Sequence, residues 1–230
     1  MNAQARERVI LVSSLVKPAL QLRGLTFGNR IDELLRGGLI PKTLTFIYGQ
    51  NANTTLNTLC ANTLHVFGGK VVFIDAANSF DPYKIVQQQA LISEKQARNF
   101  IESIIISRAF TCYQLRKLIT SNLINEIYSK ENEIRSIFVS GLSDLFNEEE
   151  NTKAEITRLE LLMVSSLRRI ASDKKNKVMF VVVSSKMRSE HLFTKADTVI
   201  KLFFERNRKK QIERAVLMKH YIRQFETIDL

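Results

Sequence analysis

The sequence predicts an open, mainly parallel α/β sheet that ends in an antiparallel hairpin. Short apolar runs, such as residues 70–75 and 178–183, are typical of strands that are buried on both faces. These runs alternate with longer segments whose apolar residues recur at helical spacing. Near the end of the chain, two strand-like runs instead flank a short basic turn at residues 206–210.

The first half of the sheet follows from five segments. Residues 29–35 form a short helix that stops at Gly37 and Gly38, because glycine commonly follows a helix C-terminus. A buried strand at residues 43–48, a helix from about Thr54 to Phe67 and a second strand at residues 70–75 come next. Strand, helix and strand within about thirty residues form one right-handed βαβ unit.

The remaining elements continue the alternation. We expect helices at residues 82–89, 93–102, 112–128 and 152–171, strands at 104–106, 137–140 and 178–183, and hairpin strands at 198–205 and 214–219. A chain of 230 residues is more consistent with one domain than with two, at roughly 100–200 residues per domain. We therefore divide it into an N-terminal arm, residues 1–24, and a single core domain, residues 25–230.

Charge and cysteine content narrow the class of protein. Lys and Arg number 34 against 23 Asp and Glu, a net charge of +11, and residues 186–223 carry eleven basic and four acidic residues. Such a segment favours polyanions, nucleic acid first. Two cysteines and three scattered histidines predict neither a disulfide framework nor a metal site. The longest apolar run is far shorter than the ~20 residues of a membrane span, so we expect no membrane contact and a cytoplasmic location.

The loop after the first strand has the outline of a phosphate-binding loop. Such loops read G-x-x-x-x-G-K-[ST], with lysine on the phosphates and a hydroxyl on Mg²⁺. Counting from Gly49, the last three places hold Thr54, Thr55 and Leu56, and no lysine occurs between Lys42 and Lys70. The loop is either an ordinary polar connection or a phosphate loop that has lost its charged groups.

Five further stretches resemble one family in their order and spacing. From Leu25 onward the chain resembles the core ATPase domain of the RecA/RadA recombinase superfamily, most closely archaeal RadA-type proteins and their paralogs. The similar stretches are residues 29–39, 68–75, 78–82, 107–114 and 140–146. The resemblance implies a RecA-like P-loop NTPase core with a mainly parallel central sheet, flanking helices and a C-terminal antiparallel hairpin.

The same resemblance implies a protein without catalysis. The family's water-activating glutamate corresponds to Ala77, and its Mg²⁺-supporting aspartate corresponds to Ser140. Phosphoryl transfer depends on positioned charge, so we expect no hydrolysis, no catalytic residue, no metal and no cofactor. Asp75 and Asp144 are alternative acids for which a structural role is favoured. Weak ATP binding at the degenerate loop is left open, because a helix N-terminus attracts anions; its residues are Gly49, Asn53, Thr54 and Thr55.

Two basic segments are candidates for DNA contact, single-stranded DNA being favoured. In the family, a loop after the last parallel strand holds DNA; here residues 184–195 carry Lys186, Arg188 and Lys195. Phe193 is either a base-stacking surface or part of the core. The turn that carries Arg206, Arg208, Lys209 and Lys210 is either a phosphate-binding patch or a solvated hairpin tip.

These expectations combine into three functions. The first is a non-catalytic RadA-like paralog that assists DNA recombination or repair by binding DNA and a RadA-type recombinase or another paralog. The partner contact is expected at the sheet edge or at the apolar residues 9–12, and a homo-oligomer is left open. The second is a structural scaffold subunit without DNA binding, and the third is a residual nucleotide-binding regulator.

Overall fold

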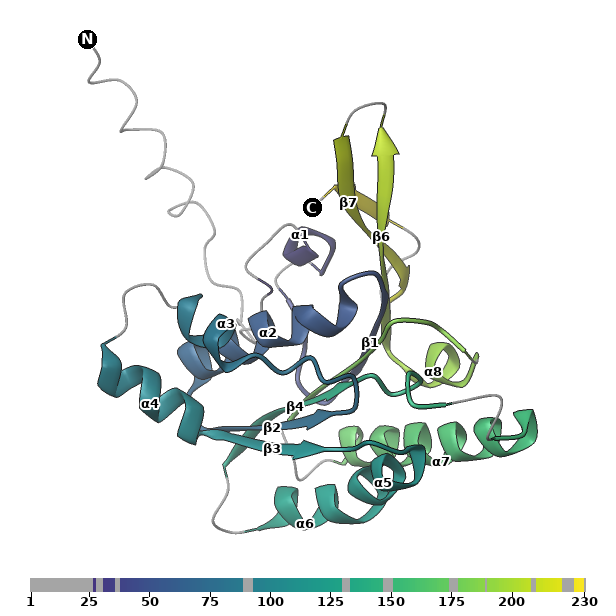
Figure 1. Cartoon of the computed structure of the whole chain (residues 1–230), viewed down its shortest axis with the longest axis horizontal. Helices are drawn as coiled ribbons and strands as arrows, with labels where there is room; N and C mark the ends of the chain where they lie inside the picture. Colours follow the sequence, from purple (N-terminus) through teal and green to yellow (C-terminus); the bar gives the residue numbers. More distant parts are fainter. Residues whose placement is uncertain are drawn as a thin grey trace.

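The computed structural model describes ten stretches of the chain, and within them lies one eight-stranded sheet (Figure 1). The described residues are 27, 31–35, 38–88, 93–129, 133–146, 151–173, 178–188, 190–207, 210–220 and 226–229. The predicted arm, residues 1–24, lies outside them. The strands are β1 (Leu44–Gly49), β2 (Lys70–Asp75), β3 (Ile104–Arg108), β4 (Ile134–Ser140), β5 (Met179–Ser184), β6 (Thr198–Asn207), β7 (Lys210–Lys219) and β8 (Glu226–Asp229).

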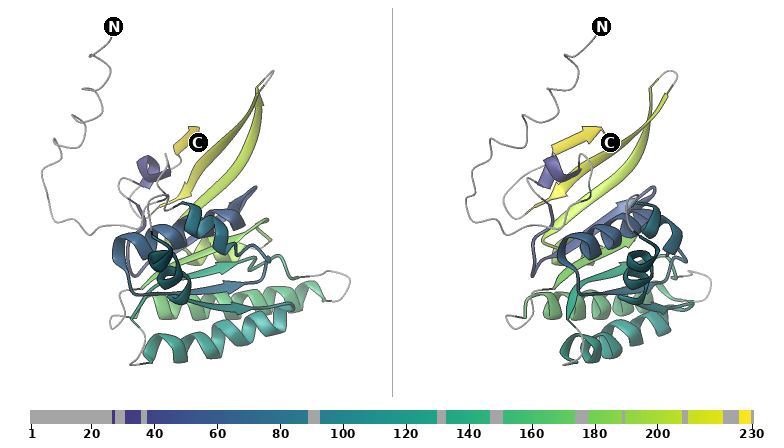
Figure 2. Two further views of the ribbon diagram at one scale, coloured as in Figure 1. Left: turned by 60° about the vertical axis from the view of Figure 1, so that its left-hand side comes forward. Right: turned by 90° about the vertical axis from the view of Figure 1, so that its left-hand side faces the viewer.

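The strand order is β3-β2-β4-β5-β1-β6-β7-β8. All pairs from β3 to β6 are parallel, whereas β6–β7 and β7–β8 are antiparallel. The predicted fold class is therefore confirmed. Figure 2 shows that β6 and β7 extend beyond the body of the sheet.

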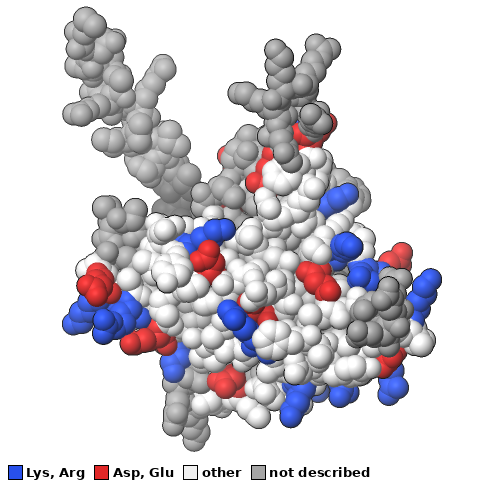
Figure 3. Space-filling model, viewed as in Figure 1, with Lys and Arg blue, Asp and Glu red and all other residues white. Residues whose placement is uncertain are grey.

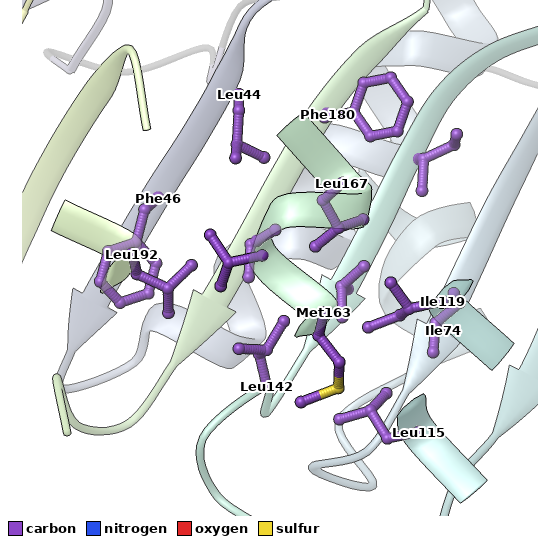
Figure 4. Packing of buried hydrophobic residues seen from close by; sticks show 14 of the residues in the cluster. Leu44, Phe46, Ile74, Leu115, Ile119, Leu142, Met163, Leu167, Phe180 and Leu192 are labelled. Carbon is purple, nitrogen blue, oxygen red and sulfur yellow. The ribbon is translucent and has the colours of Figure 1, made fainter. Parts of the chain in front are cut away.

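Helices cover both faces of the sheet. They are α1 (Ile31–Leu35), α2 (Ala52–Phe67), α3 (Pro82–Gln87), α4 (Glu94–Glu102), α5 (Cys112–Lys117), α6 (Leu123–Tyr128), α7 (Lys153–Ala171) and α8 (Glu190–Lys195), with a π-helical segment, η1 (Leu118–Asn122), between α5 and α6. Side chains alternate across each strand, so Phe46 packs with α7 and α8 on one face while Ile47 packs with α1 and α2 on the other. Figure 4 shows the first of these two cores, where Met163 and Leu167 of α7 lie against the sheet.

Several predicted boundaries were wrong. The basic turn was expected at residues 206–210, but β6 continues to Asn207 and β7 begins at Lys210. Both strands are ten residues long, because their backbones stay paired from Val199↔Lys219 to Asn207↔Lys210. The pairing therefore continues into the residues that were expected to form the turn. Strand β8 was not predicted, and the helix expected at residues 112–128 is interrupted by η1.

Local signals position the helices beside the site. Asp81 accepts hydrogen bonds from the backbone N–H groups of Tyr83 and Lys84 at the start of α3, and Thr152 accepts one from Glu155 at the start of α7. Within the described ranges, no helix has both the length and the apolar composition that a bilayer span requires.

Candidate functional site

The loop after β1 is a turn of two residues. Strand β1 ends at Gly49 and α2 begins at Ala52, so only Gln50 and Asn51 connect them. The helix was expected from about Thr54, and this boundary was wrong by two residues. Asn51 adopts the left-handed conformation with φ 61°, which Asn tolerates better than most residues. This conformation turns the chain immediately after Gln50, so α2 can begin at Ala52.

The first turn of α2 uses its own polar groups. The backbone carbonyl of Asn51 accepts from the N–H groups of Thr54 and Thr55 at 3.1 and 3.2 Å. It also accepts from their hydroxyl groups at 2.8 and 3.1 Å. Two residues predicted to contact an anion are therefore bonded within the helix.

Gly49 and Gln50 fix the turn to β6. A Cβ atom added at Gly49, which has φ +113°, would lie 2.0 Å from the carbonyl oxygen of Leu202. The N–H of Gln50 donates to that carbonyl at 3.2 Å, and the side-chain oxygen of Gln50 accepts from the N–H of Phe204 at 2.9 Å. Glycine at position 49 is thus explained by close backbone packing.

Asp144 joins the carboxyl ends of three strands. Its carboxylate accepts from the side-chain amide of Asn53 at 3.1 Å and from the hydroxyl groups of Ser184 and Ser185 at 2.8 and 2.7 Å. It also accepts from the backbone N–H of Ser185 at 3.1 Å, while Asn53 Oδ1 accepts from the N–H of Gly141 at 3.2 Å. We call Asn53, Asp144, Ser184 and Ser185 the Asp144 network. It connects the ends of β1, β4 and β5 through protein groups alone.

The two positions assigned as lost catalytic residues lie together beside this network. The hydroxyl of Ser140 donates to Asp75 Oδ1 at 2.6 Å, and the backbone N–H of Ala77 donates to Ser140 Oγ at 3.4 Å. Both Asp75 and Ser140 are buried. A Cβ at Gly141 would lie 2.8 Å from that of Ala77, so little space remains between them.

The Asp75 carboxylate contacts the turn after β2 and a neighbouring arginine, in addition to Ser140. Its carboxylate accepts from the backbone N–H groups of Ser79 and Phe80 at 3.0 and 3.1 Å and lies 3.8 Å from the guanidinium of Arg108. It therefore stabilises the turn that follows β2. This is the structural role that the sequence favoured for the acid.

A cavity of about 260 Å³ opens on the outer side of α2. Its lining includes Thr54 and Thr55 of the degenerate loop, together with Phe27, Asn51, Thr58, Lys84, Gln88 and Glu213. Among the described lining residues, Lys84 is a cation and Glu213 is a carboxylate. Asn53 is not part of its lining, because its side chain belongs to the Asp144 network.

A larger cleft of about 410 Å³ brings two predicted DNA-binding residues together. Lys186 and Arg188 line it with a third cation, Lys153, which is the first residue of α7. The other described residues that line it are Ile156, Thr157 and Met187. We call this the basic cleft. The sequence did not single out Lys153, since it lies outside the basic C-terminal segment.

The third predicted residue of that loop lies elsewhere. Lys195 is the last residue of α8 and is not among those that line the basic cleft. Phe193 is half-buried against the core, and the ammonium of Lys219 lies 6.0 Å from its ring centroid. Of the two interpretations of Phe193, the structure favours the core.

The hairpin was predicted as an anion patch, and its tip is only partly described. Arg206 lies in β6 and Lys210 in β7, while Arg208 and Lys209 fall outside the described residues. At the base of the hairpin, Lys219 donates to the carbonyls of Phe193 and Thr194 at 3.1 and 2.9 Å, and burial lowers its pKa. Lys219 therefore holds β7 to the end of α8.

Charges are interspersed on the face shown in Figure 3, where lysine and arginine side chains alternate with aspartate and glutamate. The described residues of the basic segment 186–223 lie in α8, β6, β7 and the segments that flank them. Among the described residues, no group of three or more His, Cys, Asp or Glu side chains is arranged to hold a metal ion. Burial raises the pKa of the Cys60 thiol, which keeps it protonated.

A glycine-ended strand that turns into a helix, within a mainly parallel sheet covered on both faces, is an α/β core consistent with the RecA-like fold. The sequence profile of the Rad51 family matches residues 20–221, and the chain belongs to this family. The predicted membership of the RecA/RadA recombinase superfamily is thereby confirmed.

Individual relatives are distant. "Meiotic recombination protein DMC1 homolog B" of Oryza sativa is 29% identical over 169 residues, 68% of this chain and 46% of the rice protein. "DNA repair and recombination protein RadA" of Methanoculleus marisnigri is 26% identical over 138 residues, 54% of this chain and 43% of that protein. RadB of Thermococcus onnurineus is 36% identical over 74 residues, 31% of this chain and 33% of that protein. The chain thus matches less than half the length of each of these three relatives.

Proposed function

We propose that this protein is a non-catalytic member of the Rad51 family that assists DNA recombination or repair by binding DNA and a recombinase or another paralog. The observation that carries the proposal is the Asp144 network at the strand ends where a nucleotide-binding relative would act. The names of the relatives support a role in recombination or repair, since they are recombination and repair proteins.

The residues around Gly49 do not fit a magnesium-bound triphosphate. Such a ligand needs a loop that wraps the phosphates, a lysine and a metal-supporting carboxylate. Here the loop is a two-residue turn, no lysine follows it before Lys70, and the position of the metal-supporting acid is Ser140. Asp144 is already engaged by four hydrogen-bond donors from three residues, Asn53, Ser184 and Ser185. We therefore assign no hydrolysis step to this chain.

The basic cleft supports DNA binding. Lys153, Lys186 and Arg188 provide three cations around an opening that also exposes Met187. Contacts of this kind are made to phosphates, are mostly independent of sequence and weaken steeply with salt. The sequence supplies a second basic segment at residues 206–210, with Arg206, Arg208, Lys209 and Lys210.

The test is binding of a single-stranded oligonucleotide to the purified full chain at several salt concentrations, with and without ATP and Mg²⁺. The charge-reversal triple variant Lys153→Glu, Lys186→Glu, Arg188→Glu should reduce affinity and lower the salt slope by about 2, because each lost phosphate contact removes roughly 0.7 for single strands. As a control, reversal of two cations on α4, Lys95→Glu with Arg98→Glu, should bind nearly like the wild type. An unchanged triple variant would remove the basic cleft from the proposal.

Partner binding is proposed at β3, the strand at one end of the sheet. In the described residues β3 pairs only with β2, and Ile106 is 41% exposed. The neighbouring helix α4 has no buried residue, so its cover over this edge is incomplete. An exposed strand edge can accept an added strand from another chain. Ile106→Lys should therefore weaken co-purification with a RadA-type recombinase or paralog without changing DNA affinity.

The alternatives give different results in the same assays. A scaffold subunit would hold its partner at every salt concentration and would not bind the oligonucleotide. A nucleotide-binding regulator would be stabilised thermally by ATP, since a ligand that binds only the folded state raises its melting temperature. The cavity beside Thr54 and Thr55 is the place to test the latter, and Lys84→Glu is the variant that should abolish such stabilisation.

A further inference from the structure

Two aromatic side chains are exposed at the start of α5, outside the basic cleft and the Asp144 network. The Phe110 side chain is 73% exposed and that of Tyr113 is 46% exposed. They lie on either side of Thr111, the N-cap residue of α5, where the chain leaves the carboxyl end of β3. Figure 1 shows this end of α5 beside α7. Two large aromatic residues exposed within four positions of the chain form a candidate contact surface, because exposed apolar groups that lie together commonly mark binding sites.

Hydrogen bonds fix the backbone of Phe110 and the hydroxyl group of Tyr113. The N–H of Phe110 donates to the side-chain oxygen of Gln114 at 2.9 Å, and the N–H of Gln114 donates to the hydroxyl of Thr111 at 3.2 Å. The hydroxyl of Tyr113 donates to the Glu155 carboxylate and accepts from the side-chain amide of Asn151 at 3.4 Å. The polar end of Tyr113 is therefore anchored to α7, while much of its ring stays exposed.

The anchor also links the aromatic pair to the basic cleft. Tyr113 bonds to Asn151 and Glu155, which are on either side of Lys153, and Lys153 lines the cleft. The first turn of α7 thus separates the two features, and a helix is roughly 10 Å across. Charges near the rings are mixed: Arg108 lies two residues before Phe110 and pairs with Asp75, whereas Glu155 is bonded to Tyr113.

We propose that Phe110 and Tyr113 form a stacking surface for unpaired bases of a single-stranded nucleic acid whose phosphates lie in the basic cleft. Proteins that bind single strands combine a cationic groove with aromatic rings, because every base has a face that can stack. Glu155 disfavours a phosphate at the rings themselves, which is consistent with bases rather than backbone at this place. The inference rests on the proposed DNA binding and adds the aromatic contacts that would bind the bases of a single strand.

The first test uses a fluorescent reporter. The chain contains no tryptophan, so Phe110→Trp introduces a single indole at the proposed surface. Its emission should be quenched by oligo(dT) and unchanged by an abasic oligonucleotide of equal length. The matched control is Tyr83→Trp, since Tyr83 is 78% exposed on α3, away from this surface. Equal emission changes with both oligonucleotides would overturn the inference.

The second test measures affinity. Phe110→Ala should weaken binding to oligo(dT) roughly 5- to 100-fold and leave binding to the abasic oligonucleotide unchanged, given the usual strength of base–aromatic stacking. Tyr113→Phe keeps the ring and should bind almost like the wild type, whereas Tyr113→Ala should not. The melting temperature of Phe110→Ala should stay close to that of the wild type, because this side chain is exposed. The two Tyr113 variants should lower it modestly, because each loses the hydrogen bonds to Glu155 and Asn151.

The outcomes separate the two proposals. Wild-type protein that binds neither oligonucleotide would overturn DNA binding and the stacking surface together. Wild-type protein that binds both, with Phe110→Ala unchanged, would overturn the stacking surface alone. Loss of binding to a purified RadA-type recombinase in Phe110→Ala, with unchanged oligonucleotide affinity, would show that the pair anchors a protein and would also overturn the inference.

Discussion

The hydroxyl of Ser140 donates a 2.6 Å hydrogen bond to the carboxylate of Asp75, and both side chains are buried. The bond joins the ends of the neighbouring strands β2 and β4, at the position where the family resemblance expects a second acid. Ser140 thus supplies Asp75 with a neutral hydrogen-bond donor, whereas an acid at position 140 would place two buried carboxyl groups side by side, which is costly.

Ser140→Asp should therefore destabilise the protein rather than restore a metal site. We expect a loss of about 3–5 kcal/mol in the free energy of unfolding, the usual effect of an uncompensated buried charge. Ser140→Ala is the matched control; it removes one hydrogen bond to a charged group and should cost about 1.5–3 kcal/mol. Urea unfolding of the two variants measures both values. Equal stability of Ser140→Asp and the wild type would contradict this interpretation of the site.

Gly49 should tolerate no side chain. In Gly49→Ala the new Cβ would meet the Leu202 carbonyl at 2.0 Å in a backbone with φ +113°, so β1 and β6 must separate. We expect a loss of at least about 3 kcal/mol, as for other severe packing and backbone strain. Gly68→Ala is the control, because Gly68 also has positive φ but a Cβ added there would meet no atom within 4 Å. That variant should lose about 1–3 kcal/mol, because φ 61° with ψ −155° is a backbone region that essentially only glycine occupies.

The sequence predicted the parallel core of the sheet better than it predicted short strands and helix boundaries. The parallel core was predictable because strands such as β5 are apolar at nearly every position and buried throughout. Strand β8 was missed because four residues, Glu226 to Asp229, are too few and too polar to give a periodic pattern. The early start of α2 depends on the left-handed backbone of Asn51, for which the sequence gives only a weak signal.

The candidate site was less predictable than the fold. Asn53 and Asp144 are 91 residues apart in sequence, and Ser184 is 40 residues from Asp144, so the Asp144 network follows only from the strand order. The exposure of Phe110 is likewise a tertiary property, since the same sequence stretch is compatible with a buried ring. Lys186 and Arg188 were predicted from charge alone, and their neighbour Lys153 could have been found by placing the start of α7 beside the end of β5.

Stability should fall as the pH rises above about 10, partly through Tyr48. Burial raises the pKa of the Tyr48 hydroxyl above its ordinary value of about 10. The unfolded chain then releases this proton at a lower pH than the folded chain does, so the stabilisation is present below pH 10 and is lost at higher pH. Tyr48→Phe should flatten this alkaline decrease, measured as melting temperature between pH 8 and 11. An identical pH profile for the variant would exclude Tyr48 as a contributor.

Placing a lysine where a phosphate loop requires one should not create an ATPase. In Thr55→Lys the side chain starts one turn inside α2, and the backbone N–H at this position still donates to the Asn51 carbonyl, so no loop surrounds the phosphates. The Asp144 network also remains in place, because Asn53 is unchanged. We expect phosphate release no faster than in the wild type when ATP and Mg²⁺ are present. Thr58→Lys, one turn further along α2, controls for the added charge. Magnesium-dependent hydrolysis by Thr55→Lys but not by Thr58→Lys would mean that the geometry of the turn does not limit catalysis, and would count against the non-catalytic function proposed here.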